Sequence, residues 1–389
     1  MNILIIKDYP GEIKVHKITY NIQEIGLAVA LRKKGHECDV MCVSDDNTYH
    51  EQHVEIEGQK LTVYSMSAIV ILKNGWLKKA DDVINRYDII QICEYNQIYT
   101  WHLAKKYNKK MVCYHGPYYC DFNKNYNKMA RLFDLLFAGR YRKFHTHFIT
   151  KSGLAKDYLC SKGFMNVCSI GVGLSPTLLN NSAEDVLPEL LPIAEMKCIK
   201  LLYIGALEPR RNSFFLLEVL NSLINEGLDV KLVMIGKYRN IEYQNLFENR
   251  IAELKLKDFI YYIERVEQKY LGFVYKHSDI FLLPTIYDIY GMVLLEAMYF
   301  GIPTITTVNG GSNMMIKNGE NGFVINDFNI KSWVDIIKDI TLNKDSTETI
   351  RRNAHSTIAE HFTWDALADK FIEAYNNKLF DNYEDNSSR

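Results

Sequence analysis

Several features are missing from this sequence, and each absence excludes a class of protein. No apolar run approaches the roughly 18 residues that a membrane-spanning helix needs. Neither charge is in excess, because 46 Lys and Arg face 47 Asp and Glu, so the chain is not a global polyanion binder. The eight cysteines contain no C-x-x-C pair and most lie in apolar runs, so we expect reduced, buried thiols in a cytosolic protein. The N-terminus lacks the charged start of a signal peptide and predicts a first buried strand.

The length and the alternation of apolar patterns predict the domain organisation. A chain of 389 residues favours two domains, and its 48% hydrophobic and 24% charged residues are typical of a globular protein. Short apolar runs alternate with longer amphipathic ones, which predicts an α/β fold of two doubly wound parallel sheets. We expect an N-terminal domain at 1–172, a linker at 173–198 that holds three of the eight prolines, a C-terminal domain at 199–361, and a last helix in 362–389 that packs back on the first domain.

Secondary-structure elements are predicted from these runs. Helices are expected at 22–34, closed by Gly35, at 212–226, closed by Gly227, and at 364–379, followed by a frayed polar tail. Strands are predicted at 2–6, 38–43, 89–93, 110–114, 147–150, 200–204, 230–235, 259–263, 279–283, 303–307 and 322–325.

The most informative stretch is 284–303, where a strand ends, a loop follows and a helix begins at Gly291. Glu296 lies inside this helix among apolar neighbours, and an ionised carboxylate there is costly unless something donates hydrogen bonds to it. The two hydroxyls of a ribose would suit it, and the amides of Tyr290, Gly291 and Met292 could receive phosphate or sugar oxygens. The alternative is that Glu296 pairs with a lysine or reaches solvent.

A second stretch, 201–213, runs from a buried strand through a glycine turn into a helix. Gly205 forms the turn, and Arg210 and Arg211 precede the helix start. Arginine beside free helix amides is a suitable seat for a diphosphate. The alternative is that both arginines are solvated.

These stretches resemble glycosyltransferase family 4, the retaining enzymes with the GT-B fold. The family's Glu-x7-Glu motif and Ala-Met-x-x-Gly-x-Pro run correspond to Asp288-x7-Glu296 and 297–303. Its phosphate loop, Gly-Arg-Leu-x-x-x-Lys-Gly, corresponds to 205–212. A Gly-Gly turn and an Asn-Gly-x-x-Gly-Phe run follow in family order at 310–311 and 318–323, and shorter matches cover nearly the whole chain.

The resemblance implies a role for each matching residue. Glu296 would hold the ribose of a nucleotide-sugar donor, and Asp288 stands where the family's first glutamate contacts the transferred sugar. Arg211 stands at the family's lysine and would neutralise the departing diphosphate. Val266 would present backbone groups to the base. His115, in the N-terminal domain, corresponds to a histidine that faces the reaction centre.

The sequence also departs from the family pattern. The first acid is Asp, one methylene shorter than Glu, and the family's phosphate-loop arginine is Ala206, with Arg210 as a stand-in. The family's N-terminal Gly-Gly loop would fall near Ile18 and Thr19. The sequence contains no Asp-x-Asp pair to hold a divalent ion, so we expect neither metal nor cofactor, and arginine and helix amides would stabilise the diphosphate.

A third stretch, 122–151, contains seven Lys or Arg and one acid, Asp134. Met129, Leu132, Phe133 and Leu136 follow helical spacing, which predicts a basic amphipathic helix. Such a helix could rest on an anionic membrane surface and meet a lipid-linked acceptor; the alternative is a core-facing helix with a solvated side. The residues of this predicted membrane patch are Lys128, Arg131, Arg140, Arg142 and Lys143.

Together these observations predict a cytoplasmic bacterial glycosyltransferase, peripheral on the inner face of the membrane, that acts in cell-surface polysaccharide or glycoconjugate synthesis. Its donor would be a nucleotide-diphosphate sugar, with a UDP-sugar favoured, and its acceptor a glycan, a lipid-linked molecule or another hydroxyl compound. A homodimer is compatible with the sequence, and no nucleic acid partner is expected. The alternatives are a catalytically silent GT-B subunit that supports an active partner, and a sugar-nucleotide epimerase.

Overall fold

The structure, a computed structural model, describes residues 1–14, 22–71, 74–179 and 186–387. The chain forms two compact units, one made of Met1–Gly173 with Thr363–Arg389, the other of Leu174–Phe362. Ile18 and Thr19, and residues 180–185 of the predicted linker, lie outside the described residues. Residues 174–179 and 186–198 of that linker cluster with the second unit and include the short helix α7 (Leu191–Glu195).

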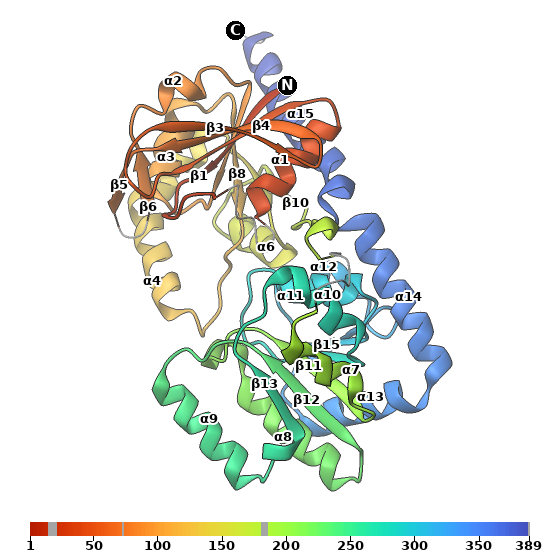
Figure 1. Cartoon of the computed structure of the whole chain (residues 1–389). Helices are drawn as coiled ribbons and strands as arrows, with labels where there is room; N and C mark the ends of the chain where they lie inside the picture. The colour runs from red at the N-terminus through yellow and green to blue at the C-terminus, as the bar shows by residue number, and fades with distance from the viewer. Residues whose placement is uncertain (15–21, 72–73, 180–185, 388–389) are drawn as a thin grey trace. The chain divides into compact units, whose positions relative to one another are not determined.

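The first unit is built on an eight-stranded sheet (Figure 1). Its strands follow the order β10-β9-β8-β7-β1-β2-β4-β3. All its pairings are parallel except that of β3 with β4. Strands β1, β2, β7 and β8 are almost completely buried runs of apolar residues, as expected where both faces of a parallel sheet are covered. The strands are β1 (Asn2–Lys7), β2 (Glu37–Val43), β3 (His50–Ile56), β4 (Gln59–Met66), β7 (Ile89–Cys93), β8 (Met111–His115), β9 (His147–Thr150) and β10 (Val167–Ser169).

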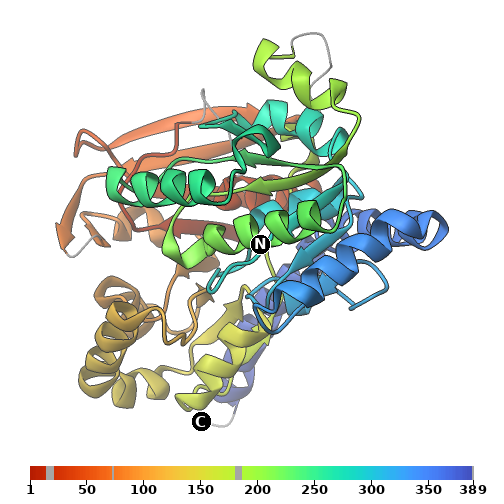
Figure 2. The same ribbon diagram turned by 90° about the horizontal axis from the view of Figure 1, so that it is seen from below.

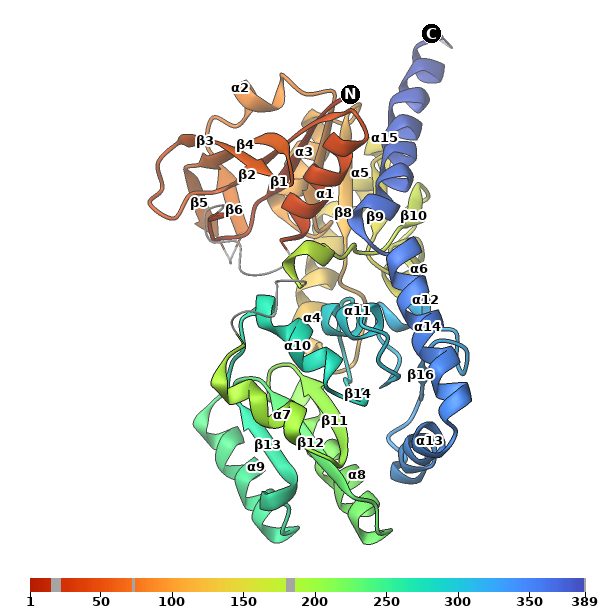
Figure 3. The same ribbon diagram turned by 45° about the vertical axis from the view of Figure 1, so that its right-hand side comes forward.

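A small antiparallel hairpin of β5 (Ala68–Ile71) and β6 (Asn74–Leu77) follows β4 in the chain (Figure 3). It is fixed to the sheet because the Gly75 amide donates to the Asp8 carbonyl at 2.6 Å. The helices of this unit are α1 (Gln23–Lys33), α2 (Asp81–Ile84), α3 (Ile98–Lys106), α4 (Lys124–Phe133), the π-helical turn η2 (Asp134–Ala138), α5 (Gly139–Tyr141), the 3-10 turn η3 (Arg142–Phe144), α6 (Gly153–Ser161) and α15 (Trp364–Ser387).

Helix α15 returns the end of the chain to the first unit. It packs beside α1, and the Tyr375 hydroxyl donates to Oε1 of Gln91 in β7 at 2.7 Å. It runs to Ser387, so the predicted helix end at Leu379 is wrong. Four of the eight cysteines are buried, and all eight are free.

The second unit is a six-stranded parallel sheet with the order β13-β12-β11-β14-β15-β16. Its strands are β11 (Ile199–Ile204), β12 (Val230–Ile235), β13 (Ile260–Ile263), β14 (Ile280–Leu283), β15 (Thr304–Thr306) and β16 (Phe323–Val324). Its longer helices are α8 (Ser213–Asn225), α9 (Ile241–Glu253), α10 (Gln268–Lys276), α11 (Met292–Tyr299), α13 (Ile330–Leu342) and α14 (Lys344–His361), and α12 (Ser312–Met315) is one turn. The predicted α/β fold of two parallel doubly wound sheets is confirmed.

Glycine ends two helices where the sequence predicted it. Gly35 adopts φ +84° after α1, and Gly227 adopts φ +82° after α8. In each case the glycine amide and the next amide donate back to carbonyls of the last turn, so the open helix end is satisfied.

Candidate functional site

The strand order of the second unit creates a switch point between β11 and β14. From β11 the chain proceeds to β12 on one side, whereas β14 lies on the other, so the loops that leave their carboxyl ends diverge there. Ligands of open α/β sheets bind at such a point. The loop after β11 carries Arg211 and the loop after β14 carries Asp288, 77 residues apart in sequence.

Arg211 and Asp288 form an ion pair through Nη1 and Oδ2. Their side chains are only 14% and 12% exposed, so solvent screens the pair weakly. A Cβ built on Gly205 would lie 3.8 Å from Arg211 Nε, which places this nitrogen beside the turn that ends β11. Arg211 Nε is buried and has no hydrogen-bond partner among the described residues. A buried donor without an acceptor is costly, and an anion at this position would satisfy it.

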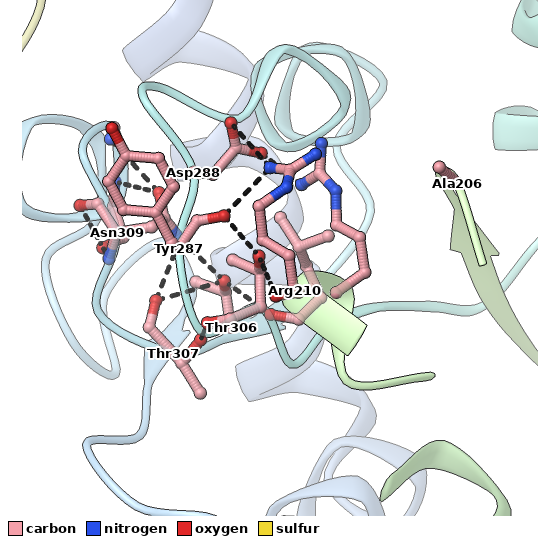
Figure 4. A network of polar contacts seen from close by, with 12 residues as sticks. Ala206, Arg210, Tyr287, Asp288, Thr306, Thr307 and Asn309 are labelled. Carbon is pink, nitrogen blue, oxygen red and sulfur yellow. Dashed lines mark hydrogen bonds and ion pairs between the residues drawn. The ribbon is translucent and has the colours of Figure 1, made fainter. Parts of the chain in front are cut away.

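Arg210 has a different role, because its guanidinium donates hydrogen bonds to neighbouring loop residues (Figure 4). Nε and Nη2 donate to Glu208 Oε1 at 3.0 and 2.7 Å, and Nη1 donates to the Tyr287 carbonyl at 3.0 Å. Its Nη1 lies 4.0 Å from Asp288 Oδ1. The Arg210 carbonyl also accepts from the Ile286 amide at 2.9 Å, so this residue ties the β11 loop to the β14 loop.

Asn309 orders the neighbouring loop after β15. Its Oδ1 accepts from the amides of Gly311 and Ser312, both at 3.1 Å, and its Nδ2 donates to Thr306 Oγ1 and to the Thr307 carbonyl (Figure 4). A Cβ on Gly310 would overlap the Ile289 carbonyl oxygen, so only glycine allows the two loops to approach this closely. The Gly-Gly turn noted in the sequence therefore holds the Asp288 loop in place.

Glu296 is almost completely buried in the second turn of α11, and both of its carboxylate oxygens accept hydrogen bonds from side chains of α10. Its Oε1 accepts from Gln268 Nε2 at 2.7 Å and its Oε2 from the Tyr275 hydroxyl at 2.9 Å. Burial raises the pKa of Glu296 to about 7, although the two hydrogen bonds oppose this shift. The expected alternative of a lysine partner or solvent exposure is wrong, because α10 supplies two neutral donors instead. Each carboxylate oxygen keeps a second lone pair for a ligand hydroxyl.

The helix start before Glu296 has an open amide end. Gly291 precedes the first residue of α11 with φ +84°, a left-handed conformation that glycine adopts without strain. Tyr290 is buried. The amides of Met292 and Val293 open α11 and precede the first one that donates within the helix, which is that of Leu294 to the Gly291 carbonyl at 2.9 Å. Val266 lies half-buried in the loop between β13 and α10, two residues before the Gln268 that contacts Glu296. The structure thus brings the predicted donor-site residues to one edge of one sheet.

A second polar cluster, which our sequence analysis largely missed, lies at the switch point of the first unit between β1 and β7. His115 is fully buried, and its Nδ1 lies 2.7 Å from Glu94 Oε2. The pKa of Glu94 lies below its ordinary value. Burial alone would raise it, but the opposing effects of His115 and Lys151 are larger. Burial raises the pKa of Asp8 to about 8, and the nearby Glu94 adds to the shift. The missed signal was the acid that follows each buried strand, Asp8 after β1 and Glu94 after β7.

The remaining predicted residues also belong to the first unit. Lys128, Arg131, Arg140, Arg142 and Lys143 are all exposed, on α4, α5 and η3 (Figure 2, dark yellow). His115 and these five residues belong to the first unit, whereas the residues predicted to bind the donor belong to the second. Within the described ranges, no helix is long and apolar enough to cross a membrane, and no group of three or more His, Cys, Asp and Glu could hold a metal ion.

Residues 193–357 match the model of the family described as Glycosyl transferases group 1. This part of the chain belongs to that family. The match contains Arg211, Asp288 and Glu296, and therefore the whole set of contacts around them.

Relatives of the group 1 glycosyltransferase segment are only moderately similar in sequence. Spore coat protein SA of Bacillus subtilis (strain 168) is 28% identical over 179 residues, which are 45% of this chain and 48% of that protein. The capsular polysaccharide biosynthesis glycosyltransferase CapM of Staphylococcus aureus is 25% identical over 178 residues, 46% of each chain. The matches span about half the length of these relatives or less.

Solved structures resemble the chain over nearly its full length. A glycosyltransferase from Rickettsia africae ESF-5 matches with a TM-score of 0.71 and 19% identity, over 97% of this chain and 98% of that one. Anabaena Alr3699/HepE, in complex with UDP-glucose, matches with a TM-score of 0.70 and 16% identity, over 97% and 100%. The predicted GT-B fold, shared with the group 1 glycosyltransferases, is confirmed.

Proposed function

We propose that the protein is a glycosyltransferase that moves a sugar from a UDP-sugar to a hydroxyl acceptor, with retention of configuration at the anomeric carbon. The observation that carries this proposal is Arg211, whose buried Nε lacks a partner among the described residues beside the Gly205 turn. A diphosphate would satisfy this nitrogen and gain charge-assisted hydrogen bonds. Two comparisons support this choice of donor: the match of residues 193–357 to the group 1 glycosyltransferase model, and the likeness of the fold to Anabaena Alr3699/HepE in complex with UDP-glucose.

In this proposal each part of the second unit has one task. Glu296 accepts hydrogen bonds from the ribose, the Val266 loop presents backbone groups to the base, and the amides of Tyr290, Gly291 and Met292 meet phosphate or sugar oxygens. Asp288 contacts the transferred sugar. Arg211 stabilises the negative charge that develops on the leaving UDP, which is the electrostatic contribution that dominates in many enzymes.

The first unit is proposed to bind the acceptor through the cluster at its own switch point. Glu94 is partly exposed, whereas His115 beneath it is not, so His115 acts by holding the Glu94 carboxylate. This differs from the role expected from the sequence, in which His115 itself faced the reaction centre. We further propose that the reaction requires neither metal nor cofactor.

A panel of nucleotide sugars tests the function directly. A ligand present at 100 times its dissociation constant should stabilise the protein by roughly 2.7 kcal/mol, which a thermal shift detects. With the correct donor and an acceptor, free UDP should appear, and the rate should be the same with EDTA as with added Mn²⁺. Conversion of the sugar without UDP release would identify an epimerase, and binding without either reaction would identify a silent subunit. Loss of activity in EDTA that Mn²⁺ restores would refute the metal-independent mechanism.

The exposed basic residues on α4, α5 and η3 support a proposed cytoplasmic location with peripheral contact with an anionic membrane. Each basic residue near such a surface contributes about 1 kcal/mol. The triple variant Arg140→Ala, Arg142→Ala, Lys143→Ala should therefore lose up to about 3 kcal/mol of binding to vesicles with anionic lipid. The protein should also detach as salt rises, because charges are screened over about 10 Å at 0.1 M.

A matched charge-loss variant in the second unit controls for net charge. The exposed residues Lys237, Lys255 and Lys257, replaced together with alanine, should leave vesicle binding unchanged. Cosedimentation with anionic and with neutral vesicles measures both variants. Equal binding to the two kinds of vesicle, or none to either, would show that the basic face is only a solvated helix surface.

A further inference from the structure

The first unit contains an apolar groove that the proposed donor chemistry does not use. Its cavity of about 360 Å³ is within the size range of small-molecule sites. Helix α4 with η2 forms one wall, the β5–β6 hairpin another, and the start of α3 a third. The residues that line this groove include Ile69, Trp76, Ile98, Tyr99, Met129, Leu132, Phe133 and Leu136.

The groove has a buried aromatic base and an exposed aliphatic rim. Phe133 and Tyr99 are 6% and 5% exposed, whereas Leu132 and Leu136 are 50% and 60% exposed. Trp76 is fixed against Tyr99, with their ring centres 5.2 Å apart. The apolar stripe of Met129, Leu132, Phe133 and Leu136 therefore lines an open groove, with only Phe133 buried at its base. Exposed apolar side chains that line one groove are typical of interaction sites.

The charges beside the groove indicate what occupies it. Lys128 lies one helical turn before Leu132, so an exposed ammonium flanks the apolar rim. Asp134 is the single acid in 122–151. Its charge is balanced by Lys162, and it accepts a hydrogen bond from the Tyr95 hydroxyl at 3.2 Å, so it does not neutralise Lys128. An apolar groove with a cationic flank complements a hydrocarbon chain that carries an anionic head group.

We propose that this groove binds the hydrocarbon chain of a lipid-linked acceptor whose phosphate lies at the basic flank. The identity of the ligand as an acceptor rests on the proposed function, but its binding requires neither donor nor transfer. This proposal differs from simple contact with a membrane surface. The affinity of a flat membrane contact would depend most on the most exposed apolar side chain of the region. The affinity of a ligand in a groove depends instead on the side chains that line the groove.

Alkyl phosphates of increasing chain length test the proposal in the absence of any nucleotide sugar. With hexyl, octyl and decyl phosphate at monomeric concentrations, each added methylene should tighten binding by roughly fourfold. Inorganic phosphate should not show saturable binding, and decyl maltoside, which has an uncharged head, should bind more weakly than decyl phosphate. A decyl phosphate brominated on its chain should quench the emission of Trp76, and the Trp76→Phe variant should lose that response. Calorimetry measures the affinities.

Helix η2 offers a matched control one residue away from a groove residue. Leu136 lines the groove, whereas Leu135 does not and is 82% exposed. Leu136→Asp should weaken decyl phosphate binding at least tenfold, and Leu135→Asp should change it less than twofold. Both positions are exposed, so both variants should fold, which circular dichroism verifies.

Three results would overturn the proposal that this groove binds a hydrocarbon chain. Equal affinities for hexyl and decyl phosphate would show that the chain does not enter it, and an equal loss in Leu135→Asp and Leu136→Asp would show a flat interfacial patch. If alkyl phosphates fail to bind while Leu136→Asp changes the sedimentation of the protein, the groove is an interface with a second copy. UDP release with a water-soluble acceptor is independent of all these outcomes, so failure here leaves the transferase assignment standing.

Discussion

Replacing Arg211 with alanine should lower kcat by about 10²–10³-fold while leaving the dissociation constant of the UDP-sugar within about fivefold. The guanidinium lies between the Gly205 turn and Asp288, where a leaving diphosphate would gain negative charge. A group that acts mainly on developing charge stabilises the transition state more than the bound donor. Single-turnover rates and donor titrations separate the two effects. A change confined to KM would show that Arg211 only helps to bind the donor.

The same substitution removes the closer ion partner of Asp288 and leaves Arg210 Nη1 4.0 Å from Asp288 Oδ1, so its effect on folding must be separated from its effect on catalysis. A buried carboxylate that loses its closer cation destabilises a protein. The double variant Arg211→Ala, Asp288→Asn should therefore recover thermal stability relative to Arg211→Ala without recovering turnover. Arg239→Ala, at an exposed position after β12, serves as the control for loss of one positive charge and should be fully active. Recovery of activity in the double variant would mean that the loss came from misfolding.

The sequence predicted the parts of the fold that are continuous apolar runs and missed those that are not. Strands β1, β7 and β12 are recognisable because both faces of a parallel strand are buried. Strand β3 reads His-Glu-Gln-His-Val-Glu-Ile and alternates between exposed and half-buried positions at the sheet edge, so its apolar signal is weak. The β5–β6 hairpin was also missed, because its second strand, Asn-Gly-Trp-Leu, begins with two residues that are typical of turns.

The residues that we propose bind the donor were identified one at a time from the sequence, but most contacts between them could not be predicted. Glu296 stood out because a carboxylate among apolar helix neighbours needs a partner. Its partners, Gln268 and Tyr275, are 28 and 21 residues away in sequence and reach it only because α10 packs beside α11. No spacing rule links such residues. In the same way, the contact of Glu94 with His115 depends on the pairing of β7 with β8, which the sequence does not specify.

Glu296 should make UDP-sugar binding depend on pH, with an effect of about tenfold between pH 8 and pH 6. Its pKa is raised from 4.5 to about 7, so near neutral pH the free protein holds it partly protonated. Ribose hydroxyls donate hydrogen bonds to the ionised carboxylate. A UDP-sugar that binds this form must therefore displace the proton from Glu296. The dissociation constant should then increase as pH falls through 7. The pKa of the adjacent Tyr275 is held far above this range by burial, so its hydroxyl stays protonated throughout.

The stability of the free protein should change in the opposite direction. A carboxyl group whose pKa is higher in the folded state stabilises the fold below its unfolded pKa and loses that contribution as pH rises through the folded value. The free energy of unfolding of the wild type should therefore fall by up to about 3 kcal/mol relative to Glu296→Gln between pH 4.5 and pH 8. UDP-glucose is a suitable ligand because its diphosphate is a diester and does not titrate here. Glu296→Gln should bind it with little pH dependence, whereas an equal pH response in the wild type and this variant would assign the titration to another group.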